Sequence, residues 1–161
     1  MDQRQFQTNA PLFYAQRLML IYEKDYDASI QQDQHALLTG AWLCLKESWG
    51  CWLNELSIYM NLERVEGYQL NELALLFKAE SPEGQLLLGL TEDSESWLAT
   101  LLVKIAEPTE RVKLPTKASA PSLGLISLVP TDEVEEDVLI MRVLSEFKEY
   151  IESVRARQVE W

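Results

Sequence analysis

The sequence has few of the side chains that bind metals or act as nucleophiles. It contains a single histidine, His35, and two cysteines, Cys44 and Cys51, among 161 residues. One histidine excludes a zinc site of the HExxH type and the paired Glu-x-x-His motifs of a di-iron bundle. The cysteines lie seven residues apart, about 10 Å along a helix, which is too far for a disulfide and differs from CxxC spacing. We therefore expect no metal, no cofactor and no catalytic residue, and we expect that the protein is not an enzyme.

Phosphate-binding loops and clusters of positive charge are also missing. The six glycines are scattered and form neither a GxGxxG nor a GxxxxGK motif, the glycine-rich loops that hold phosphates. There are 26 acidic against 14 basic residues, and the resulting net charge of −12 repels a phosphate backbone. We therefore expect no direct binding of nucleic acid.

Long apolar runs are absent as well. No stretch approaches the roughly 20 apolar residues of a membrane span, so we expect no span. The first residues, MDQRQFQTNAP, are polar and lack the apolar segment of a signal peptide. Together with cysteines that are too far apart to pair, these features predict a cytoplasmic protein.

What the sequence does contain is apolar residues at helical spacing. Hydrophobic residues make up 47% of the chain, enough for a single domain over residues 1–161 with a core of its own. A first helix is predicted from Asn9, with Pro11 in its first turn, to about Ile30. Steps of three and four residues mark its buried face, which consists of Leu12, Ala15, Met19, Tyr22 and Tyr26.

A second helix, predicted over residues 35–62, is expected to be central. Its large apolar residues recur at alternating steps of four and three: Leu38, Trp42, Leu45, Trp49, Trp52, Leu56 and Tyr59. A neighbouring stripe of small residues would let another helix approach closely: Ala41, Cys44, Ser48 and Cys51. We expect both stripes to be mostly core, with Cys44 as a buried and unreactive thiol.

The second half of the chain contains shorter helices and a long connection. Short helices are predicted over residues 70–79 and directly after Pro82, and another helix over 94–106. Residues 107–131 contain four prolines and no helical periodicity, which predicts an extended connection. The last helix is predicted over 133–157, with a buried face of Val134, Val138, Met141, Leu144, Phe147, Ile151 and Val154.

These elements predict the fold class. It is all-α: a helical bundle of four main helices plus one or two short ones, with a long extended crossover before the last helix.

Two groups of residues are candidates for a binding role. The regular spacing of the tryptophans favours a core role, but a ligand pocket between helices stays open as the alternative for Trp42, Trp49, Trp52 and Trp97. Contacts to a partner are predicted for the extended connection and the C-terminal turn, because Trp and Arg dominate interface hot spots. The residues concerned are Leu125, Ile126, Arg155, Arg157 and Trp161.

Several motifs resemble those of a known family. They are NAPLFYAQRLML near the start, WLNELSIYMNL at the end of the second predicted helix, YQLNELALL, SWLATLL and the C-terminal EW. In these motifs the chain resembles the DUF6586-type family of uncharacterised gammaproteobacterial proteins, over most of residues 9–106 and the last predicted helix. The resemblance implies a small, cytoplasmic, helical bacterial protein. It implies no activity, so no functional residues are carried over to this chain.

These observations lead to three hypotheses of function. The leading one is a non-enzymatic interaction or regulatory protein that binds an unknown protein partner, or a second copy of itself as a homodimer. The second is a small-molecule-binding bundle with the tryptophan-lined pocket. The third is an acidic decoy that occupies a nucleic-acid-binding protein, through an attraction that salt would screen.

Overall fold

The computed structural model describes residues 3–24, 31–60, 82–107 and 135–159. Within these ranges every regular element is an α-helix, which confirms the all-α fold class. The helices are α1 (Gln3–Lys24), α2 (Gln31–Tyr59), α4 (Pro82–Glu92), α5 (Trp97–Ala106) and α6 (Glu136–Val159).

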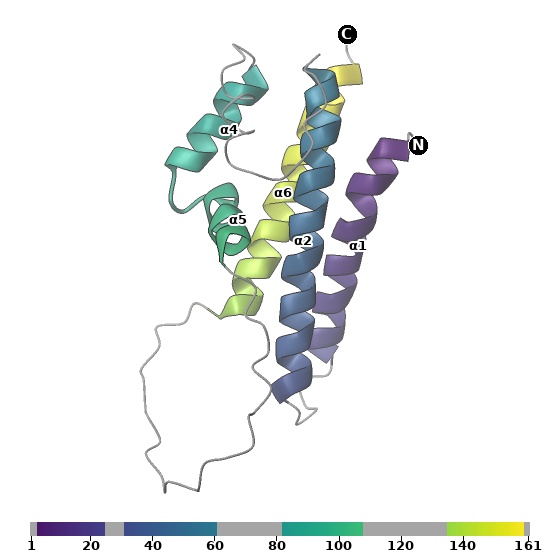
Figure 1. Cartoon of the computed structure of the whole chain (residues 1–161), viewed down its shortest axis with the longest axis vertical. Helices are drawn as coiled ribbons and strands as arrows, with labels where there is room; N and C mark the ends of the chain where they lie inside the picture. Colours follow the sequence, from purple (N-terminus) through teal and green to yellow (C-terminus); the bar gives the residue numbers. More distant parts are fainter. Residues whose placement is uncertain (1–2, 25–30, 61–81, 108–134, 160–161) are drawn as a thin grey trace, which may run out of the picture.

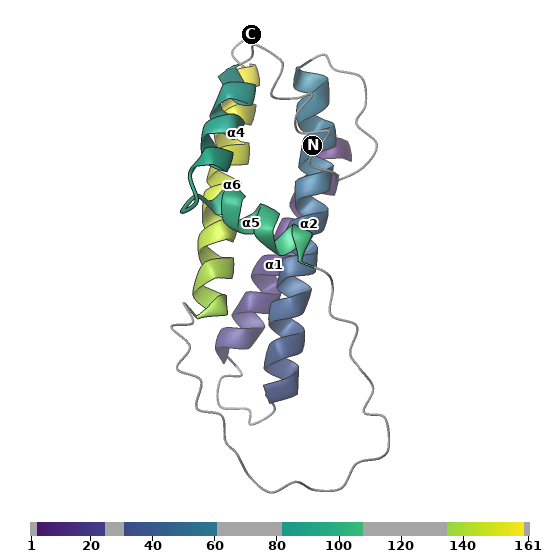
Figure 2. The ribbon, with the colours of Figure 1, turned by 60° about the vertical axis from the view of Figure 1, so that its left-hand side comes forward.

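Three long helices lie side by side and form the body of the molecule (Figure 1). The helices α1 and α2 run in opposite directions, and α6 packs against both. On the side away from α1, α5 runs across α2 and α6, and α4 packs against α5 (Figure 2). As a result, α1 forms one outer side of the bundle.

Aromatic residues fill the core where α2, α5 and α6 meet. The ring centre of Trp49 lies 5.9 Å from that of Trp97 and 5.7 Å from that of Phe147, both edge to face. Trp97 stacks on Phe147 at 4.9 Å, and such aromatic pairs add to the gain from burying large rings. The largest fully buried side chains are Trp49, Trp52, Phe147, Met19, Leu45, Leu53, Leu56, Leu87, Leu98 and Leu101. Four of them belong to the stripe of large residues predicted on α2, which confirms the predicted central position of this helix.

Residues of the small stripe on α2 pack against α1. Ala41 and Ser48 are fully buried, and the Ser48 hydroxyl donates a hydrogen bond to the carbonyl of Thr8 at 2.8 Å. At Gly40 an added Cβ would lie 3.2 Å from the Leu18 side chain. The two helices therefore approach so closely that a larger residue at this position would require a shift.

Both cysteines of the small stripe are free and half-buried. Burial, followed by the negative charge of Glu47, raises the pKa of the Cys44 and Cys51 thiols. A raised pKa lowers the fraction of thiolate at neutral pH, and the thiolate is the nucleophilic form.

The predicted start of the first helix is wrong. The helix α1 begins at Gln3 rather than Asn9, and Pro11 lies inside it. Proline lacks an amide hydrogen and removes one helical hydrogen bond. The lost bond is the one to the carbonyl of Gln7. The neighbouring Thr8 is held against α2, because Ser48 donates a hydrogen bond to its carbonyl and its hydroxyl donates one to Glu55. Tertiary contacts therefore extend the helix past a local start signal.

Two other helix starts also differ from the prediction. The helix α2 begins at Gln31 instead of residue 35, and Asp33 in its first turn interacts favourably with the helix dipole. The helix α5 begins at Trp97 instead of residue 94. There the Ser96 side chain accepts a hydrogen bond from the Ala99 amide at 3.0 Å and caps the helix.

The predicted buried face of the last helix is wrong at its N-terminal end. Val138 and Met141 are 54% and 38% exposed, whereas Ile140 and Val143 are fully buried. Because α6 contacts α1, α2 and α5, its buried face is turned relative to the predicted stripe at this end. Further along the helix the prediction is confirmed, at Leu144, Phe147, Ile151 and Val154.

Some predictions concern residues outside the described ranges. They are the end of the first helix near Ile30, the short helix over 70–79, the connection over 107–131 apart from Glu107, and residues 133–134 of the last predicted helix. The predicted start of this last helix is wrong at residue 135, which is not helical, since α6 begins at Glu136.

Candidate functional site

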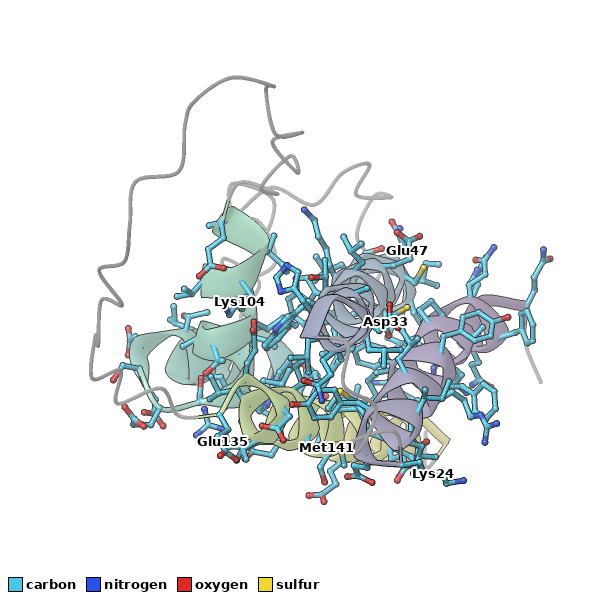
Figure 3. The ribbon with its side chains drawn as sticks, turned by 90° about the horizontal axis from the view of Figure 1, so that it is seen from below. Lys24, Asp33, Glu47, Lys104, Glu135 and Met141 are labelled. Carbon is cyan, nitrogen blue, oxygen red and sulfur yellow. The ribbon has the colours of Figure 1, made fainter. Side chains whose placement is uncertain are left out.

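The helix α1 exposes apolar side chains on the side that faces away from α2 and α6. These residues have exposed fractions between 36% and 60%, and they are Phe6, Phe13, Tyr14, Leu20 and Ile21. Phe6, Phe13 and Leu20 repeat every seven residues, as do Tyr14 and Ile21, so all five lie on one side of the helix. We call these five residues the α1 strip. Figure 3, which looks along the bundle, shows side chains that project outward from α1, away from the other helices.

The opposite side of α1 is also apolar, and it packs against the bundle. Its buried residues are Thr8, Leu12, Ala15 and Met19. Other exposed large hydrophobic residues are spread over four helices: Leu43, Ile58, Leu86, Val103, Val138 and Met141. A helix that is apolar on two sides is normally covered on both. Among the described residues, nothing covers the α1 strip to the extent that α2 and α6 cover the inner side.

The helix that carries the α1 strip is positively charged in a strongly acidic protein. The helix α1 contains three cations, Arg4, Arg17 and Lys24, and one carboxylate, Glu23, so its net charge is +2. The whole chain has a net charge of −12. Arg17 follows Phe13 by four residues, which places it within the strip. Arginine and aromatic residues are enriched where proteins bind one another.

A groove runs between α1 and α6 next to the strip. It has a volume of about 220 Å³, and it is lined by Asn9, Leu12, Phe13, Gln16, Leu144, Lys148, Ile151, Glu152 and Arg155. Phe13 belongs both to the groove and to the strip. The two surfaces are therefore continuous.

At Arg155 the groove meets a buried ion pair. Nε and Nη2 of Arg155 donate hydrogen bonds to the two carboxylate oxygens of Glu55, at 2.7 and 2.8 Å. This bidentate arrangement is the strongest form of an ion pair. The hydroxyls of Thr8 and Tyr59 donate to the same carboxylate at 2.8 and 2.7 Å, and Nη1 of Arg155 donates to Asn9 at 2.9 Å. The network thus joins α1, α2 and α6.

The environment of this pair favours its charged form. The side chains of Glu55 and Arg155 are only 2% and 17% exposed. Burial by itself raises the pKa of Glu55, but hydrogen bonds from Arg155, Tyr59 and Thr8 outweigh burial, so this pKa lies below its usual value. Each carboxylate oxygen already accepts two hydrogen bonds, which suits a group that holds three helices together.

The predicted partner contacts are found in different surroundings. Arg155 is engaged inside the molecule, as described above. Arg157 is 47% exposed and lies 3.6 Å from Glu83 of α4. Leu125, Ile126 and Trp161 lie outside the described residues.

Sequence reasoning missed both Glu55 and the α1 strip. Glu55 follows Trp52 by three residues and precedes Tyr59 by four, so it lies beside the apolar stripe of the second predicted helix. An acid at such a position needs a partner when it is buried, and this was the available signal for Glu55. The strip was signalled by Phe6, Phe13 and Tyr14, which do not fit the predicted buried face of the first helix.

Of the four tryptophans proposed for a pocket, three lie in the core. Trp49, Trp52 and Trp97 are at most 3% exposed. Trp42 instead lines a second cavity of about 240 Å³ between α2, α5 and the start of α6. The cavity is lined by His35, Thr39, Trp42, Leu43, Lys46, Leu101, Lys104, Ile105, Glu107 and Glu136.

The polar groups of this second cavity contact one another. The indole nitrogen of Trp42 and Nζ of Lys104 both donate hydrogen bonds to Oε1 of Glu136, at 3.0 and 3.2 Å. Nζ of Lys104 also lies 5.7 Å from the ring centre of Trp42 and 3.3 Å from Glu107. Burial by itself lowers the pKa of Lys104, but its contacts with Glu136 and Glu107 outweigh burial and raise it.

Two other kinds of site are absent from the described residues. These residues contain no group of three or more metal-binding side chains. None of their helices combines the length and the apolar character needed to cross a membrane.

Fold and site together define a small α-helical bundle with one exposed helix face that is aromatic and basic. The chain belongs to a family of unknown function (DUF6586), whose model matches residues 1–161. No curated protein and no solved structure matches the chain significantly.

Proposed function

We propose that this chain is a non-enzymatic protein-interaction protein and that the α1 strip is its docking surface. The observation that carries the proposal is the concentration of five exposed large hydrophobic residues on one side of a single helix. Large contiguous apolar patches on soluble proteins usually mark interaction sites. The adjoining groove adds a recess in which a partner's side chain can be buried, and such pockets hold the hot-spot residues of interfaces.

The experiment compares two pairs of substitutions. In Phe6→Gln/Phe13→Gln, two strip residues that are 60% and 57% exposed become polar. In the matched control, Val103→Gln/Leu86→Gln, two residues that are 61% and 42% exposed on α5 and α4 are changed in the same way. Helix content and thermal unfolding, measured by circular dichroism, establish that both variants fold. Because exposed positions contribute little to stability, we expect both to do so.

Binding is then measured by affinity capture with each tagged protein and by sedimentation of the purified chain. We expect wild type and control to bind a specific protein, either a second copy or another protein, and the strip variant to lose it. Equal binding by all three proteins would show that the strip is not the docking surface.

A second candidate function is supported by the cavity beside Trp42. Its volume of about 240 Å³ lies slightly below the range of about 300–1,000 Å³ that is usual for small-molecule sites, and it combines apolar side chains with Lys46, Lys104 and Glu136. An amphipathic metabolite bound there would change the environment of the Trp42 indole. We would titrate wild type and Trp42→Phe with a panel of metabolites and fatty acids. A saturable change in fluorescence that the variant lacks would support this function, and flat titrations of wild type would oppose it.

A further inference from the structure

The spacing along α1 suits a contact between two identical helices. Phe6 and Leu20 lie seven residues before and after Phe13, which is about 10 Å in either direction along the axis. If a second α1 lies antiparallel with Phe13 near the twofold axis, Phe6 of each copy faces Leu20 of the other. The two Phe13 residues then meet at the centre. A twofold contact requires such self-complementarity.

The position of Arg17 is compatible with the same arrangement. In this register Arg17 of one copy lies near Ala10 of the other, so a long side chain meets a small one and the two arginines stay apart. Two chains of net charge −12 repel each other over most of their surfaces. The two α1 helices, each with a net charge of +2, also repel each other, so the apolar side chains of the strip drive this contact.

The exposed area of the strip matches the size of a stable interface. An aromatic side chain has an area of about 150–250 Å², so three aromatic residues that are more than half exposed and two aliphatic ones present on the order of 400 Å² of apolar surface. Two copies contribute about 800 Å². Since about 57% of a typical interface is apolar, the whole contact would bury about 1,400 Å². Specific dimers bury about 1,200–2,000 Å².

We propose that the α1 strip binds the α1 strip of a second copy of this chain, with the two helices antiparallel and Phe13 nearest the twofold axis. This inference rests on the proposed function, because it names the partner of the same docking surface. Phe13 of each copy lies at the edge of the groove between α1 and α6. The partner's Phe13 therefore lies against the mouth of that groove and is covered by its walls.

The first test measures the mass of the full-length chain by sedimentation equilibrium from micromolar to millimolar concentration. We expect a reversible change from monomer to dimer for wild type and for Val103→Gln/Leu86→Gln. For Phe6→Gln/Phe13→Gln we expect the dissociation constant to rise at least about tenfold, because two central apolar contacts are lost from each copy. A wild-type chain that stays monomeric at every concentration would overturn the inference.

The second test determines the register and direction of the two helices by disulfide trapping. In a Cys44→Ala/Cys51→Ala background, one preparation carries Ala10→Cys and another carries Arg17→Cys. The antiparallel register brings these two positions together, so mild oxidation of the mixture should give mainly the mixed dimer. Each protein alone should cross-link slowly, because identical positions lie about 9–12 Å apart along the axis, beyond the reach of a disulfide. A Leu43→Cys protein measures cross-linking by random collision.

The outcomes separate this inference from the proposed function. Rapid cross-linking of each protein alone would indicate parallel helices and overturn the antiparallel arrangement. A monomeric chain that binds a different protein through the α1 strip would overturn the second copy as partner and leave the proposed function intact. If a monomeric chain binds anionic lipid vesicles and Phe6→Gln/Phe13→Gln abolishes this binding, both the dimer and the proposed protein-docking function are wrong.

Discussion

Two ion pairs of the molecule, Glu55–Arg155 and Glu136–Lys104, lie in opposite surroundings. Glu55 and Arg155 are almost fully buried between α1, α2 and α6, and their carboxylate accepts four hydrogen bonds. Glu136 and Lys104 join α6 to α5 near the other end of α2, with side chains that are 41% and 26% exposed. The first pair is protected from solvent, and the second is in contact with it. We therefore expect burial, more than distance, to decide what each pair contributes to stability.

The largest effect is expected when the buried pair is broken. In Arg155→Ala the Glu55 carboxylate stays buried without its main partner, which typically costs about 3–5 kcal/mol. The stacking of Arg155 over Trp52, at 5.7 Å, is lost as well. Urea unfolding at pH 7 measures the difference in the free energy of unfolding. Arg157→Ala is the matched control, since its 47% exposed side chain should contribute less than about 1 kcal/mol. A loss below about 1 kcal/mol for Arg155→Ala would show that the two pairs do not differ as burial predicts.

The next effect is a dependence of stability on pH that arises from Glu55. Its pKa is lowered in the folded protein, so the folded state favours the carboxylate. The resulting stability is complete above the pKa of the unfolded chain and is lost as the pH falls through the lower, folded value. We expect the difference in unfolding free energy between wild type and Glu55→Gln to be constant near neutral pH. Below about pH 4.3, the ordinary value for a glutamate, it should shrink. If the difference in unfolding free energy between wild type and Glu55→Gln stays constant down to pH 3, the pH dependence of stability does not arise from Glu55.

A smaller effect is expected when the half-exposed pair is broken. In Lys104→Met the salt bridges to Glu136 and Glu107 are lost, but water can solvate both carboxylates. Exposed pairs of this kind contribute about 0–1 kcal/mol. Urea unfolding should therefore show a change well below that of Arg155→Ala, and the Trp42 fluorescence spectrum should shift because the cation above its ring is removed. A destabilisation of about 3 kcal/mol or more would place this pair in the same class as the buried one.

The smallest effect is the response of the two pairs to salt. At 1 M NaCl the screening length is about 3 Å, which weakens exposed charge pairs far more than buried ones. We expect the stability difference between wild type and Lys104→Met to approach zero at this concentration. The difference for Arg155→Ala should be nearly unchanged. Urea titrations in low and high salt measure both stability differences. If high salt reduces the difference for Arg155→Ala as much as the difference for Lys104→Met, the Glu55–Arg155 pair is accessible to solvent.

Much of the fold was predictable because helix formation depends on local spacing. The stripe from Leu45 to Leu56 on α2 was predicted as core and is buried. The family was also recognisable from packing motifs, and the match over residues 1–161 confirms it. The candidate site was less predictable. Its tryptophans were expected either in the core or in a pocket, and of the four proposed only Trp42 lines a described cavity.

The errors have a common physical cause. Pro11 is a local start signal, yet α1 begins eight residues before it, where Thr8 bonds to Ser48 and Glu55 of α2. The buried face of α6 was derived from its own spacing, but Val138 and Met141 lie on a side that no neighbouring helix covers fully. Arg155 was assigned to the surface because its partner, Glu55, is 100 residues away in the sequence.

The sequence by itself determined that this protein is helical, that α2 is its central element and which family it belongs to. These properties follow from periodicity and from motifs, which act over one or two helical turns. Only the tertiary structure decided which side of each helix is buried, which charges meet and which apolar side of α1 stays exposed. Those outcomes depend on which helices become neighbours, because an apolar stripe can pack against any complementary surface and a charge can pair with any partner within reach.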